Sequence, residues 1–275
     1  MNFSMNSDFE NILREYKEGK ISLTKAAEKL NTSRYKLKKL LENKNIKVDS
    51  TYKKRTHFFN ENFFKNIDTE EKAYWLGFIS ADGHVGKYQI SIILSYKDKD
   101  HLFKLCNDID GSSLKVKEGY VNTSYGNIKT VRITINSIQM VKDLRKLGLQ
   151  SNKTYNLSFP NIPDNFTRHY IRGYFDGDGC ISLSGGTYKK PYVIFLGNKS
   201  MMCSIKNHMN ISKKVSILKR EDKKEMYHFR IGKHKDVINI YDYFYTDSTV
   251  YLDRKKDKFE KLIGASETII AQPKA

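Results

Sequence analysis

Two stretches of the chain, Trp75-Leu-Gly-Phe-Ile-Ser-Ala-Asp-Gly83 and Ile171-Arg-Gly-Tyr-Phe-Asp-Gly-Asp-Gly179, share one pattern that decides the fold. Each is largely apolar, carries a second small residue four positions after a glycine, and ends in Asp-Gly. The small-residue pairs are Gly77 with Ala81 and Gly173 with Gly177. Glycine inside a helix costs about 1 kcal/mol relative to alanine, so a compensating gain is needed. The pattern therefore predicts two helices whose backbones approach closely.

Both stretches also place a carboxylate where a helix disfavours it. Asp82 and Asp178 fall in the last turn, which carries partial negative charge, and they lie 178 − 82 = 96 residues apart. Two carboxylates brought together repel each other unless a cation lies between them. The spacing therefore predicts one structural unit used twice, in which a pair of packed helices presents two aspartates to a divalent metal ion.

The composition indicates a globular protein with a polyanionic partner. The 275 residues are 39% hydrophobic, which supports a sizeable core, and the formal net charge is +18. Nucleic acid is the commonest partner of such a charge, and a solvated surface that keeps the protein soluble is the alternative. Three cysteines without a Cys-x-x-Cys pair indicate reduced thiols. With neither a signal-peptide pattern nor a membrane-length apolar run, we expect a cytoplasmic protein without a membrane partner.

The N-terminal region is predicted to be a small helical domain over residues 1–50. Helices at 23–30 and 34–42, joined by the tight turn Asn31-Thr-Ser33, resemble the helix-turn-helix module. The second of these helices carries the candidate DNA-binding residues Arg34, Lys36, Lys38 and Lys39. The alternative is an amphipathic bundle that contacts a protein. Residues 51–66 are predicted as a basic linker that either follows a DNA groove or is simply solvated.

The remaining sequence predicts an α+β fold with an internal repeat. A first half at 67–160 and a second half at 161–264 each have the order helix, two strands, helix, two strands, helix, and a tail follows at 265–275. The segments Val131-Arg-Ile-Thr134 and Phe229-Arg-Ile-Gly232 occupy matching places in the two halves. The third strand of the first half is predicted at 113–119.

Basic residues recur at strand positions of both predicted sheets. They are Lys115, Lys117 and Arg132 in the first half, and Lys219, Arg220 and Arg230 in the second half. Alternate side chains of a strand face the same way, so one face of a sheet can pack on helices while the other enters a DNA groove. We predict these six residues as DNA contacts, mostly to phosphate, with Arg132 and Arg230 as the best candidates for contacts to bases.

Both glycine-containing stretches resemble the motif that names the LAGLIDADG homing endonucleases, and the resemblance covers roughly residues 70–262. It implies a monomer of two αββαββα halves that saddles duplex DNA and cuts both strands with a divalent cation, Mg²⁺ or Mn²⁺. The last acidic position of each motif carries over to Asp82 and Asp178 as metal ligands and catalytic residues. Gly77, Ala81, Gly173 and Gly177 carry over as the helix interface.

The resemblance further implies a basic residue near each scissile phosphate. In the first half this role falls on Lys153, and in the second half either Arg254 or Lys255 could fill it. The chain departs from the motif at Ser80, which stands where the second copy has Asp176. Arg172 also replaces a residue that is usually small or apolar.

These observations predict a sequence-specific endonuclease that makes double-strand breaks in DNA, with a mobile intron as the setting implied by the resemblance. Two alternatives stay open: an RNA-binding maturase that assists intron splicing, and a catalytically inactive DNA-binding regulator. The presence of both motif aspartates favours cleavage without excluding a role with intron RNA.

Overall fold

The computed structural model describes residues 7–18, 21–43, 46, 48, 57–124, 126–150, 157–184, 190–211, 216–219 and 225–270. The chain forms two compact units, Met1–Thr56 and His57–Ala275. Each unit has its own hydrophobic core. Among the helices of the described residues, none has both the length and the apolar character that a membrane span requires.

The N-terminal unit contains three short helices, α1 (Ser7–Lys17), α2 (Leu23–Lys29) and α3 (Arg34–Asn43). The hydroxyl of Ser22 caps α2 by accepting a hydrogen bond from the backbone N–H of Lys25 at 3.1 Å. The hydroxyl of Ser33 accepts from the N–H of Lys36 in the same way at the start of α3. The helices pack through a core formed by Phe9, Leu13, Tyr16, Leu23, Ala26, Ala27, Leu37 and Leu41.

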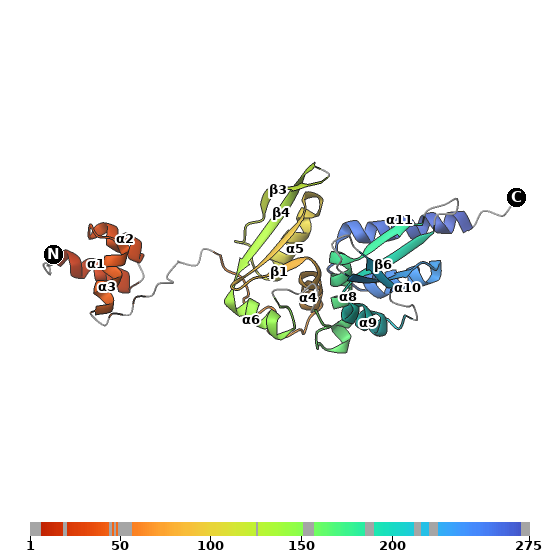
Figure 1. The fold of residues 1–275 in the computed structure, drawn as a ribbon, viewed down its shortest axis with the longest axis horizontal. Helices are drawn as coiled ribbons and strands as arrows, with labels where there is room; N and C mark the ends of the chain where they lie inside the picture. Colours follow the sequence, from red (N-terminus) through yellow and green to blue (C-terminus); the bar gives the residue numbers. More distant parts are fainter. Residues whose placement is uncertain are drawn as a thin grey trace. The chain divides into compact units, whose positions relative to one another are not determined.

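The larger unit repeats one order of elements (Figure 1). Its first half contains α4 (Glu70–Asp82), β1 (Gly83–Val85), β2 (Gln89–Ser95), the 3₁₀ turn η1 (Tyr96–Asp98), α5 (Lys99–Asp108), β3 (Lys117–Thr123), β4 (Gly126–Asn136) and α6 (Ile138–Lys146). Its second half contains α8 (Asp164–Asp178), β5 (Cys180–Leu183), β6 (Pro191–Gly197), α9 (Lys199–His208), β7 (Ser216–Lys219), β8 (Glu225–Ile231), α10 (His234–Tyr245) and α11 (Asp253–Ile270).

Each half builds one four-stranded antiparallel sheet, with strand orders β1-β2-β4-β3 and β5-β6-β8-β7. In β2, the alternate residues Ile90, Ile92 and Leu94 are buried while the residues between them are more exposed. One face of the sheet therefore packs on the core and the other stays open, as period-2 patterning requires. The prediction of an α+β fold is confirmed.

The strand predicted at 113–119 is wrong for residues 113–116, because β3 begins at Lys117 and continues to Thr123. The chain first makes a turn in which the N–H of Leu114 bonds to the carbonyl of Gly111 at 2.8 Å, and the Leu114 side chain is buried. Burial of Leu114 holds this turn against the core, so pairing with β4 starts only at the register Lys117–Arg132. Lys115 therefore lies in the connection before the strand.

Helices α4 and α8 pack against each other at the centre of the larger unit, side by side in Figure 1. A Cβ added to Gly77 would overlap the backbone carbonyl of Tyr170, and one added to Gly173 would overlap that of Tyr74. The two glycines thus make reciprocal contacts from opposite helices. Because a methyl group does not fit at either position, glycine sets the separation of the two helices.

Candidate functional site

The two motif aspartates lie at neighbouring helix ends. Asp82 is the last residue of α4, Asp178 is the last residue of α8, and both are exposed. Between them, a Cβ on Gly177 would overlap the Cβ of Ala81 and lie 3.4 Å from the backbone nitrogen of Asp82. The close approach of the helices at Gly177 therefore brings two exposed carboxylates to one place.

A glycine follows each aspartate and turns the chain directly into the first strand of its half. The N–H of Gly83 bonds back to the helix at Ile79, and that of Gly179 bonds back at Phe175. Both glycines are extended, so left-handed backbone does not explain them. Lack of space explains why both residues are glycine, because a Cβ would press on the side chain of Ile79 in one half and on the ring of Phe175 in the other.

The donor set suits a hard divalent cation. Mg²⁺ is held in proteins by one or two carboxylates, and waters and substrate phosphates complete its coordination. Asp82 and Asp178 provide such a pair of oxygen donors. Within the part of the chain that the structure describes, no group of three or more His, Cys, Asp or Glu side chains could hold a metal ion. A magnesium ion held by Asp82 and Asp178 would therefore need waters and a substrate phosphate to complete its coordination.

Lys255 places a buried positive charge at the end of α8. Its Nζ donates hydrogen bonds to the carbonyl oxygens of Phe175 at 2.5 Å, Gly179 at 2.7 Å and Gly177 at 3.3 Å. Burial lowers the pKa of Lys255 to about 8, while the carboxylates of Asp176, Asp82 and Asp178 act in the opposite direction. The ammonium offsets the negative end of the helix that carries Asp178.

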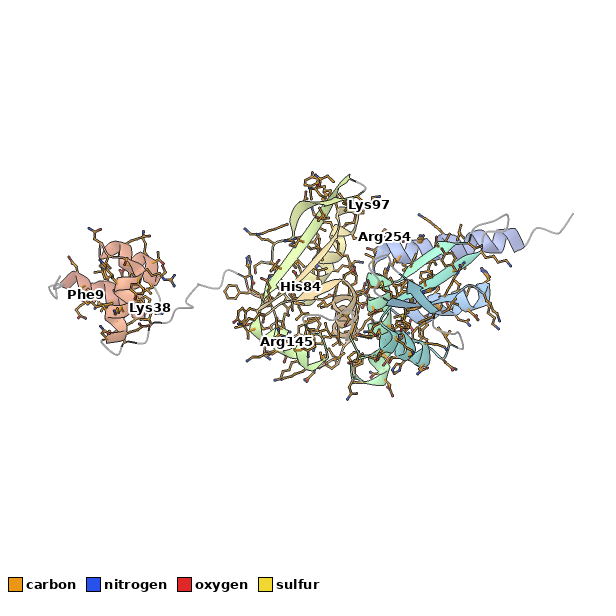
Figure 2. The ribbon with its side chains drawn as sticks, viewed as in Figure 1. Phe9, Lys38, His84, Lys97, Arg145 and Arg254 are labelled. Carbon is orange, nitrogen blue, oxygen red and sulfur yellow. The ribbon has the colours of Figure 1, made fainter. Side chains whose placement is uncertain are left out.

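Arg254, the other second-half candidate, is engaged elsewhere. Its guanidinium forms two hydrogen bonds with the carboxylate of Asp98, at 2.9 and 3.0 Å, and this pairing raises the pKa of Arg254. Figure 2 labels Arg254 at the start of α11. Of the two alternatives, Lys255 is therefore the one that contacts the end of a motif helix. Lys153, the first-half candidate, lies outside the described residues.

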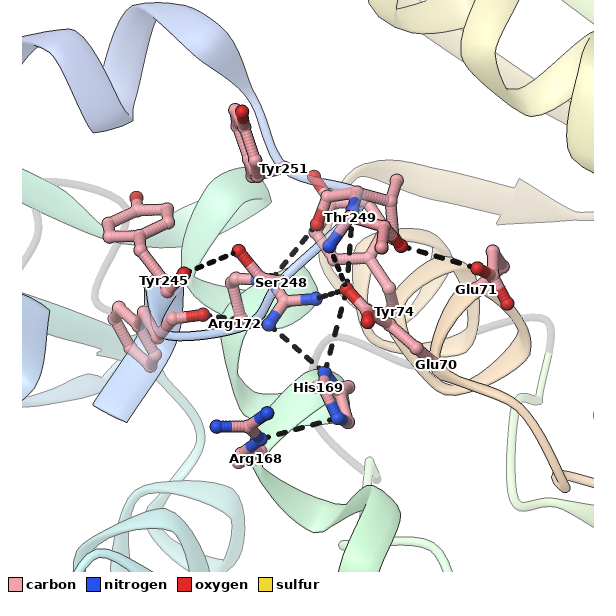
Figure 3. Close-up of polar contacts among 12 residues, drawn as sticks. Glu70, Glu71, Tyr74, Arg168, His169, Arg172, Tyr245, Ser248, Thr249 and Tyr251 are labelled. Atoms are coloured by element: carbon pink, nitrogen blue, oxygen red, sulfur yellow. Dashed lines mark hydrogen bonds and ion pairs between the residues drawn. The ribbon is translucent and has the colours of Figure 1, made fainter. Parts of the chain in front are cut away.

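A buried polar network that the sequence reasoning missed joins the two halves (Figure 3). Arg172 is fully buried and donates to the carbonyls of Val250 at 3.0 Å and Phe244 at 2.7 Å, and to the Glu70 carboxylate at 2.6 Å. The same Glu70 oxygen accepts from the N–H groups of Thr249 at 2.7 Å and Val250 at 3.2 Å. An arginine inside the motif helix thus anchors the segment 246–252 against the start of α4.

Asp176 completes this network from the same helix. Its Oδ2 accepts hydrogen bonds from the backbone N–H of Leu252 at 2.8 Å and the Tyr74 hydroxyl at 2.7 Å. Burial raises the pKa of Asp176, while the Lys255 charge and these hydrogen bonds act against the rise. Because Leu252 directly precedes α11, Asp176 helps to fix the helix that carries Lys255. Arg172 and Asp176, two charged residues four positions apart among the apolar residues of the second motif, were the signal for this network.

Eight of the ten predicted DNA-contacting side chains are exposed on their own units. Lys117, Arg132 and Arg230 are exposed on strands, and Lys115 is exposed in its loop. Lys219 ends β7, and Arg220 lies outside the described residues. In the N-terminal unit Arg34, Lys36, Lys38 and Lys39 are all exposed on α3, where Figure 2 labels Lys38. Lys38 lies 3.6 Å from Glu42 in a surface ion pair.

Comparison with solved structures shows a likeness to LAGLIDADG meganucleases at low sequence identity. The structure is similar to the crystal structure of the LAGLIDADG meganuclease I-AabMI bound to uncleaved DNA, with a TM-score of 0.50 and 14% identity over 72% of this chain and 91% of that chain. The homing endonuclease I-WcaI bound to its DNA recognition sequence gives a TM-score of 0.49 and 14% identity, over 71% of this chain and 91% of that one. The likeness to I-AabMI shows the α+β fold of LAGLIDADG meganucleases, with two antiparallel sheets.

Sequence comparison is less informative. No protein-family model matches the chain. The replication factor C small subunit of Methanocaldococcus jannaschii is 29% identical over 161 residues, which is 57% of this chain. The matched region spans only 8% of the length of that protein.

Proposed function

We propose that this protein is a metal-dependent endonuclease that cuts both strands of a specific duplex DNA. The observation that carries the proposal is the placement of Asp82 and Asp178, two exposed carboxylates at the adjoining ends of the packed helices α4 and α8. The fold supports it, because a solved structure with this fold is bound to DNA. The net charge of +18 supports a polyanionic substrate.

Each part of the proposed site has a distinct task. Asp82 and Asp178 would hold the ion, and a bound Mg²⁺ or Mn²⁺ would polarise the scissile phosphate and activate the attacking water. Lys255 keeps positive charge beside Asp178, which offsets the repulsion between the helix end and an approaching phosphate. Lys153 is proposed as its counterpart in the first half. The open faces of the two sheets bind the duplex on either side of the site, in a monomer.

The N-terminal unit is proposed to act as a helix-turn-helix module that extends the target contact. Its exposed α3 residues, Arg34, Lys36, Lys38 and Lys39, are the proposed contacts. A mobile intron is proposed as the genetic setting, on the resemblance to homing endonucleases alone.

The test separates binding from cleavage. A target is selected from randomised duplexes by binding in Ca²⁺, and cleavage is then started with Mg²⁺. Asp82→Asn and Asp178→Asn should each abolish cleavage and leave binding within a few-fold of wild type. Asp257→Asn, at an exposed position on α11, is the matched control and should cut normally. Retained cleavage in both motif variants would refute the metal assignment. If the wild-type protein binds the target but cuts it with neither Mg²⁺ nor Mn²⁺, the endonuclease proposal fails and an inactive DNA-binding regulator is the remaining interpretation.

A further inference from the structure

A stacked arginine and tyrosine lie on the open face of the second sheet. The guanidinium carbon of Arg230 is 3.7 Å from the centre of the Tyr192 ring. Arg230 on β8 stands opposite Ile194 on β6, so Tyr192 is its diagonal neighbour, within reach of a long side chain. The neighbouring residues Phe229 and Ile231 are buried, whereas Arg230 is exposed. The stack therefore faces away from the core, on the side available to DNA.

Glycine leaves room for this arrangement. The residue after Ile231 is Gly232, and a Cβ placed on it would lie 3.8 Å from the Cβ of Tyr192. Gly232 is thus the neighbour of Tyr192 across the strand pair and contributes no side chain that competes for the ring. The tyrosine ring can then lie along the sheet towards Arg230.

The first half repeats the arginine without the ring. Arg132 on β4 stands opposite Ile93 on β2, just as Arg230 stands opposite Ile194. The position that corresponds to Tyr192 holds Ser91, and Ser91 pairs with Thr134, which corresponds to Gly232. On its other side Arg132 stands directly opposite a second cation, Lys117, on β3.

These surroundings suit the two arginines to different contacts. Stacking on an aromatic ring restricts the rotamers of a guanidinium and fixes its plane while leaving it charged. A fixed plane favours the two parallel hydrogen bonds that arginine makes with O6 and N7 of guanine in the major groove. Two cations directly opposite each other on a sheet repel, and an anion between them removes the repulsion. Phosphate is the anion that duplex DNA offers.

We infer that Arg230 reads a guanine with Tyr192 as its positioning residue, whereas Arg132 and Lys117 together bind backbone phosphate. This inference rests on the proposed function, because it assigns unequal tasks to the two DNA-facing sheets. The two halves of the target should therefore differ in how strictly they are read.

The test measures binding in Ca²⁺ to the selected target and to all its single-base variants. Wild-type protein should prefer guanine at one position of the second half-site by about tenfold or more. Tyr192→Phe keeps the ring and should keep this preference. Tyr192→Ser, which copies the first half, should reduce the preference to less than threefold without changing the salt dependence of binding. Arg230→Lys keeps the charge, removes the planar fork, and should give the same loss.

The phosphate assignment has a different signature. Arg132→Gln and Lys117→Gln should weaken binding to every base variant by a similar factor, and each should reduce the slope of log affinity against log salt by about 1. Thermal unfolding of each variant shows that the fold is intact. A Tyr192→Ser protein that keeps the guanine preference would overturn the inference, as would an Arg132→Gln protein that changes preference at one base only. If wild-type protein binds no duplex, the proposed function fails, and this inference fails with it.

Discussion

Replacing Gly77 by alanine tests the helix packing on which the site depends. The added methyl group would meet the carbonyl of Tyr170 and the backbone nitrogen of Tyr174, both on α8. Neither group belongs to a flexible side chain that could rotate away. The two helices must therefore separate, and their separation also moves Asp82 relative to Asp178.

The expected magnitude is the balance of two effects. Overpacking of a tight interior costs about 1–3 kcal/mol, and contact with backbone on the facing helix places this site near the upper end. Alanine recovers about 1 kcal/mol of helix propensity relative to glycine. We therefore expect Gly77→Ala to lower the free energy of unfolding by about 2 kcal/mol. Cleavage should fall by more than the loss of folded protein, because the carboxylate pair is displaced.

Urea unfolding of the protein, followed by circular dichroism, measures the effect against a matched control. Gly264 lies in helix α11, and a Cβ there would meet no atom within 4 Å. Gly264→Ala should stabilise the protein by about 0.5–1 kcal/mol, the ordinary propensity gain. The double variant Gly77→Ala with Gly173→Ala should cost less than the sum of the two single changes, because one helix separation accommodates both methyl groups. A Gly77→Ala protein as stable as Gly264→Ala would refute the packing argument.

Two further predictions concern acid stability and the N-terminal unit. Burial lowers the pKa of His101 to about 3, against about 6.5 when unfolded, so the folded state binds fewer protons and stability falls as pH drops below 6.5. Between pH 7 and pH 5 this histidine alone should remove about 2 kcal/mol from the free energy of unfolding. His101→Gln should flatten this dependence of the free energy of unfolding on pH. Deletion of residues 1–50 should weaken target affinity and its salt dependence while sparing the single-turnover cleavage rate, and unchanged affinity would mean that this unit has another partner.

The order of helices and strands could be predicted from the sequence, because that order depends on local patterns of apolar and polar residues. The period-2 alternation of Ile90, Ile92 and Leu94 predicts a strand with one buried face, and β2 has one. The glycine spacing predicts closely packed helices, and no Cβ fits at Gly77 or Gly173. The start of β3 could not be predicted in this way, because it depends on how a turn before the strand packs on the core.

The polar network around Arg172 was beyond sequence reasoning for a related reason. Its partner Glu70 is 102 residues away, and its partners Phe244 and Val250 are 72 and 78 residues away. A buried arginine is stable only where carboxylate and carbonyl acceptors surround it, and those acceptors are known only from the fold. The pattern of the motif helix alone identifies Arg172 as unusual and leaves its partners open.

The two motif helices are therefore repeated in shape but not in electrostatics. At the positions that correspond to Arg172 and Asp176, the first motif helix has Leu76, which is fully buried, and Ser80, whose hydroxyl bonds within its own helix to the carbonyl of Leu76 at 2.7 Å. Loss of one partner from a buried charged network costs about 3–5 kcal/mol, because it leaves an uncompensated charge. A molecule with two copies of the first motif helix would leave the segment 246–252 without its anchor. A molecule with two copies of the second would bury a further arginine and aspartate, each of which needs hydrogen-bond partners of its own. The halves cannot be exchanged, so the asymmetry of this molecule begins at its central helix pair and is not confined to the surfaces proposed to read DNA.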